Sequence, residues 1–151
     1  MSPWLRPLAA LAYLLPWADA VGFGAALFRV IPSLQWLALP TLPVVLIEKG
    51  VPFGGFILFL VLFLAVVRNA RVPQLVRFHV LQAILLDILL IVIGLAFQVL
   101  LRPLGDSVVV RTLANTVFLA ALLAVLYGVI EAVRGREGDL PGISQAVRMQ
   151  L

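Results

Sequence analysis

The sequence predicts an all-α integral membrane protein, a four-helix bundle with an interfacial or re-entrant segment between its first and second helices. Hydrophobic residues make up 64% of the 151 residues and charged residues only 12%, whereas soluble domains contain roughly 45–50% and about 25%. The apolar residues also gather in four runs that have about the length an α-helix needs to cross a bilayer. A chain of this length suits a single membrane domain.

The first predicted helix covers residues 8–28 and contains both a proline and an acid, Pro16 and Asp19. Glycines follow the acid, so this helix is expected to kink. Its start also resembles a signal peptide, with Arg6 ahead of the apolar run and small residues around Asp19. Because the apolar run resumes at Val21, we expect it to be kept as a helix.

The next segment, residues 31–47, is apolar but is divided by Pro32, Pro40 and Pro43 into pieces too short to span. Trp36 is a side chain that favours the headgroup region. We therefore predict an interfacial or re-entrant segment here, the alternative being an additional span.

The other predicted helices cover residues 51–67, 80–101 and 112–133, and a polar tail follows at 134–151. Proline near the start of the second suits the first turn of a helix. A proline and a glycine after the third end that helix. Within the tail, residues 143–151 form a short amphipathic stretch, where Ser144 is a candidate cap.

Basic residues are unevenly divided between the two ends of the predicted bundle. The termini and the hinge at 68–79 hold seven, and the opposite loops hold four, namely Arg29, Lys49, Arg102 and Arg111. Because cytoplasmic loops carry an excess of basic residues, the termini are predicted to be cytoplasmic. Nucleic-acid binding is not expected, since such surfaces interleave basic residues with exposed aromatic ones.

Several kinds of chemistry are excluded by composition. The chain has no cysteine and one histidine, His79, so disulfides, thiolate sites and multi-histidine metal sites are ruled out. No serine lies near a base, no carboxylates are paired at catalytic spacing, and no glycine-rich phosphate loop follows a strand. We predict neither an enzyme nor a resident cofactor or metal.

Asp87 is the leading candidate for a functional polar residue, because it interrupts a run of isoleucine and leucine. A carboxyl group in hydrocarbon is costly and is usually functional or paired. At helical spacing it shares a face with Gly94 and Gln98, and this face is predicted to pack against a stripe on the fourth helix that ends at Glu131. The favoured interpretation of Asp87, and of Asp19, is structural. The alternative is an ion or proton site, or the lining of a passage.

Further polar candidates surround the hinge: Arg68, Asn69, Arg77 and Gln82. Gln82 is interpreted as a hydrogen-bond partner between helices. His79 is interpreted as a polar anchor at the interface, with pH sensing as the alternative. Tyr13 and Trp17 are interpreted as interface anchors.

Six sequence stretches resemble one known family in order and spacing. They are LAYLLPWADAVGFG at 11–24, VPFGGFILF at 51–59, VVRN at 66–69, VRF at 76–78, QAILLDI at 82–88 and PGISQAV at 141–147. Together they resemble the twenty-kilodalton membrane subunit of the chloroplast inner-envelope protein translocon and its cyanobacterial relatives. Two departures from the family stand out. His79 occupies a position where the family often has asparagine. No transit peptide precedes the first predicted helix, so we expect a bacterial, cyanobacterial-type member, the alternative being a plastid-encoded one.

This resemblance implies a four-helix subunit of a protein-translocation assembly, with a channel-like or scaffold role, in a bacterial plasma or thylakoid membrane. Expected partners are the lipid bilayer, other membrane proteins or further copies of the chain, and a translocating polypeptide. The alternatives are a small cation-conducting pore or transporter and a non-conducting assembly factor.

Overall fold

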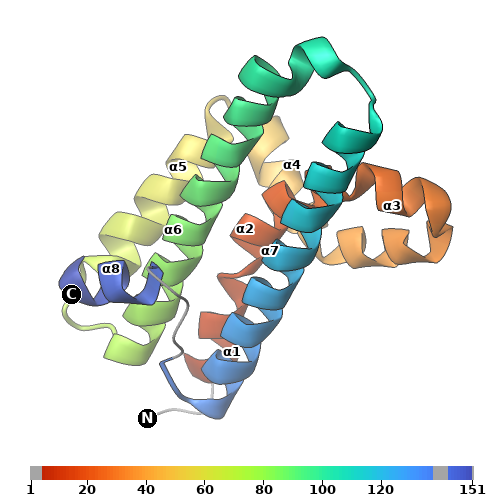
Figure 1. The fold of residues 1–151 in the computed structure, drawn as a ribbon. Coiled ribbons are helices and arrows are strands. Elements are labelled where there is room, and N and C mark those ends of the chain that lie inside the picture. Colours follow the sequence, from red (N-terminus) through yellow and green to blue (C-terminus); the bar gives the residue numbers. More distant parts are fainter. Residues whose placement is uncertain (1–4, 138–142, 151) are drawn as a thin grey trace.

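A computed structural model describes residues 5–137 and 143–150, and every element in this part of the chain is a helix (Figure 1). Three helical stretches, Leu5–Val30, Gln74–Leu104 and Val108–Arg134, are long and apolar enough to cross a bilayer. A fourth is obtained if the bent pair Pro32–Gly50 and Gly54–Val67 counts as one span. The expected all-α membrane architecture is confirmed at this level.

The first stretch is broken rather than continuous. It consists of α1 (Leu5–Leu11), α2 (Leu14–Ala20), a 3-10 turn η1 (Val21–Gly24) and α3 (Ala25–Val30). Pro16 has no N–H to donate to the carbonyl of Ala12, and the N–H of Leu15 donates there instead, at 3.2 Å. The chain therefore bends where the sequence predicted a kink.

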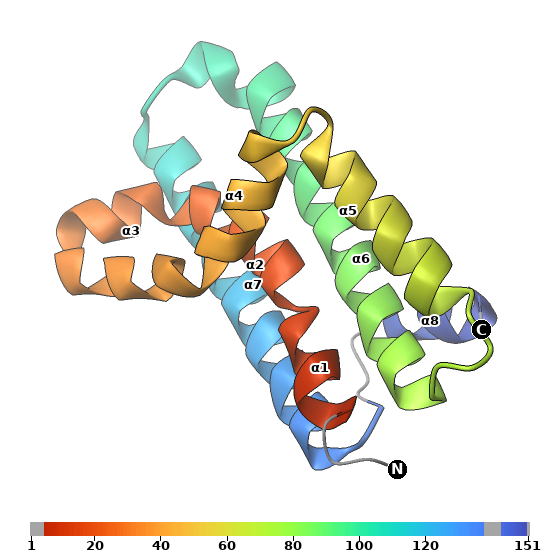
Figure 2. The same ribbon diagram turned by 180° about the vertical axis from the view of Figure 1, so that it is seen from behind.

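With α3 the chain leaves the bundle sideways, and it then returns (Figures 1 and 2). The return runs through a 3-10 helix, η2 (Pro32–Thr41), and then α4 (Leu42–Gly50). The indole N–H of Trp17 donates to the carbonyl of Leu37 at 2.8 Å, which ties η2 to α2. Trp17 is thus buried, at 6% exposure, and is not the interface anchor that the sequence suggested.

A tight turn joins α4 to α5 (Gly54–Leu62), which continues as a π-helical turn, η3 (Phe63–Val67). The axes on either side of this turn are bent by 113°. Phe53 adopts a left-handed conformation with φ 56°, and a Cβ on Gly54 would collide with the carbonyl of Ile47. The helix expected to begin at residue 51 therefore begins only after this turn.

Two long helices complete the membrane core. Helix α6 (Gln74–Ala96) continues through η4 (Phe97–Leu101) and η5 (Arg102–Leu104), and α7 (Val108–Arg134) follows. Both begin earlier than the hydrophobic runs at 80 and 112, because a hydropathy boundary marks the edge of the hydrocarbon and not the last hydrogen-bonded turn. The hydroxyl of Ser107 accepts from the N–H of Val110 at 3.3 Å and caps α7.

The last helix, α8 (Ile143–Gln150), lies across α6 with Ser144 and Val147 buried. Residues 141–142 of the PGISQAV stretch lie outside the described residues. The start of α1, the hinge between η3 and α6, and the end of α7 all lie at the same end of the molecule as α8 (Figures 1 and 2).

The predicted packing of the Asp87 face against the stripe on α7 is wrong. An apolar groove of about 310 Å³ separates α6 from α7 over part of their length, and Leu86, Leu90 and Ala120 line it. The Asp87 face is turned toward the N-terminal helices instead, as Gly94 shows, because a Cβ there would lie 3.8 Å from Phe23 in η1. The error arises because helical spacing defines a face but not the helix that covers it.

Candidate functional site

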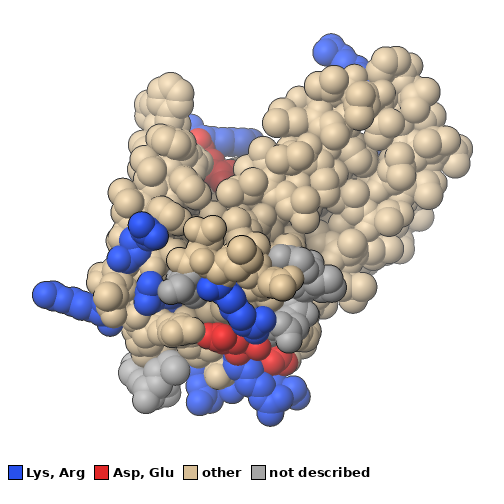
Figure 3. Space-filling view, turned by 60° about the vertical axis from the view of Figure 1, so that its left-hand side comes forward, with Lys and Arg blue, Asp and Glu red and all other residues tan. Residues whose placement is uncertain are grey.

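Three acids from different helices lie near one another, and of these Asp87 is buried while the other two are half-buried. Asp87 of α6 is 8% exposed, and the carboxyl group of Asp19 on α2 is close enough to interact with it electrostatically. The carboxyl group of Glu48 on α4 is close enough to interact with it electrostatically. We call Asp19, Glu48 and Asp87 the acid cluster. Figure 3 shows acidic side chains in a hollow with a basic side chain beside them, away from the other group of acidic and basic side chains at one end of the molecule.

The acid cluster has an unsatisfied atom. Oδ1 of Asp87 is buried without a hydrogen-bond partner in the described part of the chain, which is expensive in an apolar surrounding. Among the described residues, no three histidine or acidic side chains are arranged to hold a metal ion. Carboxyl oxygens gathered in this way can attract a positively charged group.

A second set of buried polar groups lies near the hinge end. The Tyr13 hydroxyl of α1–α2 lies 2.7 Å from Nδ1 of His79, and Nε2 of Gln82 donates to the same hydroxyl at 2.9 Å. Ser144 of α8 donates its hydroxyl hydrogen to Oε1 of Gln82 at 2.5 Å, and Nε2 of His79 lies 2.7 Å from the carbonyl of Arg136. We call Tyr13, His79, Gln82 and Ser144 the polar network.

The direction of each hydrogen bond in the polar network follows from groups that can only accept or only donate, namely the carbonyl of Arg136 and the amide oxygen and nitrogen of Gln82. The carbonyl of Arg136 can only accept, so Nε2 of His79 carries the hydrogen, and in the neutral ring Nδ1 must accept from Tyr13. The hydroxyl oxygen of Tyr13 then accepts from Gln82, whose carbonyl accepts from Ser144. The network thereby joins the first span, α6 and α8 at one end of the bundle.

Gly128 of α7 allows this arrangement. A Cβ at that position would lie 2.5 Å from two ring carbons of Tyr13, closer than carbon atoms approach without repulsion. Tyr13 is only 1% exposed, and His79 and Gln82 are both fully buried. The sequence interpretation of Tyr13 and His79 as interface anchors is therefore corrected, since both lie inside the bundle.

The hinge candidates mainly shape the backbone. Nε of Arg77 donates to the carbonyl of Val67 at 2.9 Å and so caps the end of η3. Oδ1 of Asn69 accepts from the N–H of Arg71 at 3.0 Å, which forms a local turn. The guanidinium of Arg68 lies 5.8 Å from the centre of the Phe63 ring.

The other two candidates are separate from both clusters. Gln98 is exposed on η4, and Glu131 is paired with Arg134 at 4.0 Å. Of the residues singled out from sequence, the structure thus brings Asp19 close to Asp87 and joins Gln82 to Tyr13, His79 and Ser144. Sequence reasoning missed Glu48, which lies in the segment expected at the interface. The available signal was that Glu48 follows an apolar run next to a Gly-rich turn.

A match to a known protein family extends over nearly the whole chain. A family model described as "Chloroplast import apparatus Tic20-like" matches residues 2–147, a range that contains both the acid cluster and the polar network. The chain belongs to the Tic20-like family.

Its relatives within this family include bacterial and plant proteins. A Tic20 family protein of Synechocystis is 40% identical over 147 residues, which are 97% of this chain and 92% of the relative. Protein TIC 20-v, chloroplastic, of Arabidopsis thaliana is 33% identical over 97% of this chain and 70% of its own length. Protein TIC 20-II, chloroplastic, of the same plant is 30% identical over 97% and 72%. The resemblance inferred from sequence is confirmed, and the chain is a cyanobacterial-type Tic20-like protein.

Proposed function

We propose that this chain is a membrane subunit of a protein-translocation assembly, in a bacterial plasma or thylakoid membrane. The observation that carries the proposal is the match of the import-apparatus family across residues 2–147, which covers every span and both polar clusters. The alignment with the Synechocystis relative, which covers 97% of this chain and 92% of the relative, supports the same proposal.

Of the two roles within such an assembly, the packing favours a scaffold that forms part of a passage together with other subunits. Large side chains fill the interior, with Phe78 fully buried, Phe118 1% exposed and Ile84 2% exposed. A bundle filled in this way has no room for a polypeptide along its own axis. A channel-like role then requires other membrane proteins, or further copies of the chain, to form the rest of the wall.

Exposed apolar side chains supply surface for such partners as well as for lipid. Val99 is 74% exposed, Leu123 68% and Leu64 62%, and they lie on three different helices. A photocrosslinking amino acid placed at each position in native membranes tests the proposal. We expect at least one position to crosslink reproducibly to a distinct membrane protein or a second copy. Crosslinks to lipid alone at all three positions would count against an assembly role.

The orientation belongs to the same proposal. We expect the end that carries the hinge and α8 to be cytoplasmic, because seven basic residues of the sequence belong to it. The chain has no cysteine, so a cysteine replacing Ala70, Met149 or Leu104, all exposed, reports sidedness without background. Ala70 and Met149 should label from the cytoplasm and Leu104 from the other side. Labelling of Ala70 and Leu104 from one side would refute the topology.

A cation-conducting pore remains the second candidate, and the acid cluster is the observation that favours it. Carboxyl groups in a membrane domain are typical of ion and proton paths. Replacing Asp19 and Asp87 together by asparagine and measuring cation flux in liposomes separates the two functions. The translocation-subunit proposal predicts no acid-dependent flux, whereas a flux that disappears in the double variant would favour the pore.

A non-conducting assembly factor predicts no acid-dependent flux and stable partners, but no contact with moving polypeptides.

A further inference from the structure

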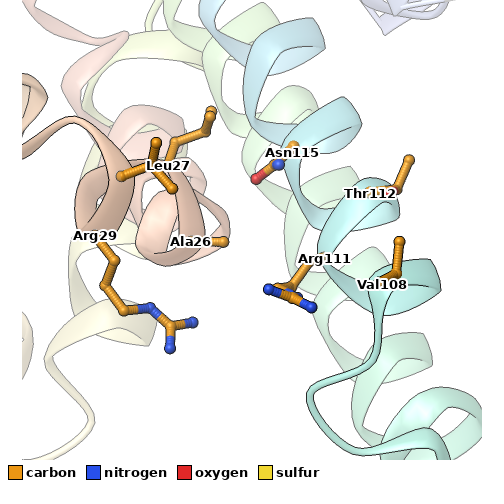
Figure 4. A pocket seen from close by; sticks show the side chains of 8 residues that line it. Ala26, Leu27, Arg29, Val108, Arg111, Thr112 and Asn115 are labelled. Atoms are coloured by element: carbon orange, nitrogen blue, oxygen red, sulfur yellow. The ribbon is translucent and has the colours of Figure 1, made fainter.

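A cleft of about 410 Å³ lies between α3 and the beginning of α7, at the end of the molecule opposite the hinge. Ala26 and Leu27 form one wall and Val108 and Thr112 the other. The side chains of two arginines, Arg29 from α3 and Arg111 from α7, point toward one another across the opening (Figure 4). The cleft is distinct from both the acid cluster and the polar network.

The charge balance in this cleft is positive. Asp106 lies 3.7 Å from each arginine, and all three side chains are about half to two-thirds exposed. At that distance and exposure the ion pairs are weak. One carboxylate also cannot satisfy two guanidinium groups, each of which has five N–H donors. One positive charge is therefore left in excess, with donors directed into the opening.

Two further features favour an anion with a hydroxyl-bearing group. The cleft lies at the N-terminus of a 27-residue helix, where the N–H groups of the first turn create a partial positive charge. Asn115 points from α7 toward α3 (Figure 4), and its Oδ1 is buried without a hydrogen-bond partner among the described residues. Because this oxygen is buried, the Asn115 side chain must rotate toward the opening before the oxygen can accept a hydrogen bond from a ligand hydroxyl group.

The surroundings distinguish a lipid from a free anion. Val30 is 77% exposed and Val108 68%, so apolar side chains border the charged opening. Arg29 is the last residue but one of the candidate span Leu5–Val30, and Arg111 lies in the first turn of the candidate span Val108–Arg134. We therefore expect both arginines to lie at the depth where lipid headgroups meet hydrocarbon, since they stand near the ends of these candidate spans.

We propose that this cleft binds the headgroup of an anionic phospholipid. The phosphate lies between Arg29 and Arg111, a headgroup hydroxyl donates to Asn115, and the acyl chains run along Val30 and Val108. Arginine suits this role because its planar donors match phosphate oxygens in pairs. In the absence of lipid, Asp106 occupies the same two arginines and competes with the phosphate. The inference does not depend on the proposed translocation role.

The test compares lipids that share acyl chains and differ in charge. Delipidated protein in detergent is titrated with phosphatidylglycerol or phosphatidylcholine, and binding is followed by native mass spectrometry and by the thermal midpoint of unfolding. We expect phosphatidylglycerol to bind more tightly. The double variant Arg29→Gln/Arg111→Gln should lose about 25-fold in affinity, since each basic residue near an anionic headgroup is worth about fivefold.

Two single variants show whether a change in lipid affinity comes from this cleft. Arg102→Gln removes an exposed arginine from the same end of the molecule, outside this cleft, and should leave affinity unchanged. Asp106→Asn should raise affinity, because it removes the competing carboxylate. If the two arginines and Asp106 formed only a structural clamp, Asp106→Asn would lower the thermal midpoint as the double variant does and would not tighten binding.

Three other outcomes would overturn the proposal. The first is a double variant that elutes as folded protein and binds phosphatidylglycerol as tightly as the unaltered chain does. The second is equal binding of the two lipids. The third is a shift of the thermal midpoint by inorganic phosphate as large as that caused by phosphatidylglycerol, which would indicate a site for a soluble anion.

Discussion

Gly128→Ala should destabilise the protein, although alanine is the better helix former. The new methyl group would lie 2.5 Å from two ring carbons of Tyr13 and 2.8 Å from its hydroxyl oxygen. Normal contact between carbon atoms is about 3.5–4.0 Å, so the ring must move by roughly 1 Å. Tyr13 is 1% exposed and has no solvent to move into, and its hydroxyl holds hydrogen bonds to His79 and Gln82.

The expected change in the free energy of unfolding combines three contributions, of which two destabilise the folded protein and one stabilises it. Overpacking a filled core costs about 1–3 kcal/mol, and weakening the hydrogen bonds of Tyr13 costs about 1 kcal/mol more. Replacing glycine by alanine within a helix stabilises the helix by about 1 kcal/mol. We therefore expect a net destabilisation of about 1–3 kcal/mol, with the polar network disrupted at the same time.

Gly22→Ala is the matched control, because a Cβ at Gly22 has no atom within 4 Å. It should leave stability unchanged or raise it by less than about 1 kcal/mol. The assay is reversible unfolding in mixed micelles with increasing denaturing detergent, followed by circular dichroism. Opposite signs for the two substitutions support the close approach of Tyr13 to α7. A Gly128→Ala protein as stable as Gly22→Ala would refute this packing.

Three further substitutions test other contacts. Tyr13→Phe removes two hydrogen bonds and leaves the groups of His79 and Gln82 unsatisfied, so the same unfolding assay should show a loss of about 2 kcal/mol. Trp17→Phe removes the bond to Leu37, and hydrogen exchange in residues 32–41 should become faster while global stability falls by about 1 kcal/mol. Ser144→Ala removes the bond between α8 and Gln82, and exchange in residues 143–150 should increase at a similar cost.

Each of these substitutions has its own contrary result. Tyr13→Phe at unaltered stability would show that the hydroxyl contributes nothing to the packed state. Unchanged exchange in η2 after Trp17→Phe would show that other contacts hold the lateral segment. For Ser144→Ala, equal exchange in α8 would mean that its other contacts, such as fully buried Val147 and the Arg148 guanidinium over the Phe78 ring, anchor the helix.

The class of the protein could be predicted from sequence because hydrocarbon imposes a strong constraint on length and composition. About twenty predominantly apolar residues in a row have few other solutions, and the three long candidate spans follow from that rule although each of them contains an acid. The prolines at 32, 40 and 43 likewise predicted that the segment after the first span would be broken. What that segment does in the membrane is still a prediction.

The partners of individual side chains could not be predicted in the same way. Asp87 was identified as a bundle-facing residue, but its neighbours Asp19 and Glu48 are 68 and 39 positions away in the sequence. Helical periodicity relates residues within one helix and carries no information on which helix lies opposite. Tyr13 illustrates the same limit of periodicity. An aromatic residue near the end of a span is typical of the membrane interface, but Gly128 of α7, far away in the sequence, leaves space for the Tyr13 ring inside the bundle.

The most direct test of a protein-translocation role is contact with polypeptides in transit. A photocrosslinking amino acid replaces exposed Leu123 on α7, and cells are pulse-labelled, irradiated and chased before the protein is isolated. The proposal predicts crosslinks to many newly made polypeptides that disappear during the chase, together with permanent crosslinks to membrane partners. Permanent partners without any transient polypeptide, also with the probe at Val99 and Leu64, would contradict it and favour a non-conducting assembly factor.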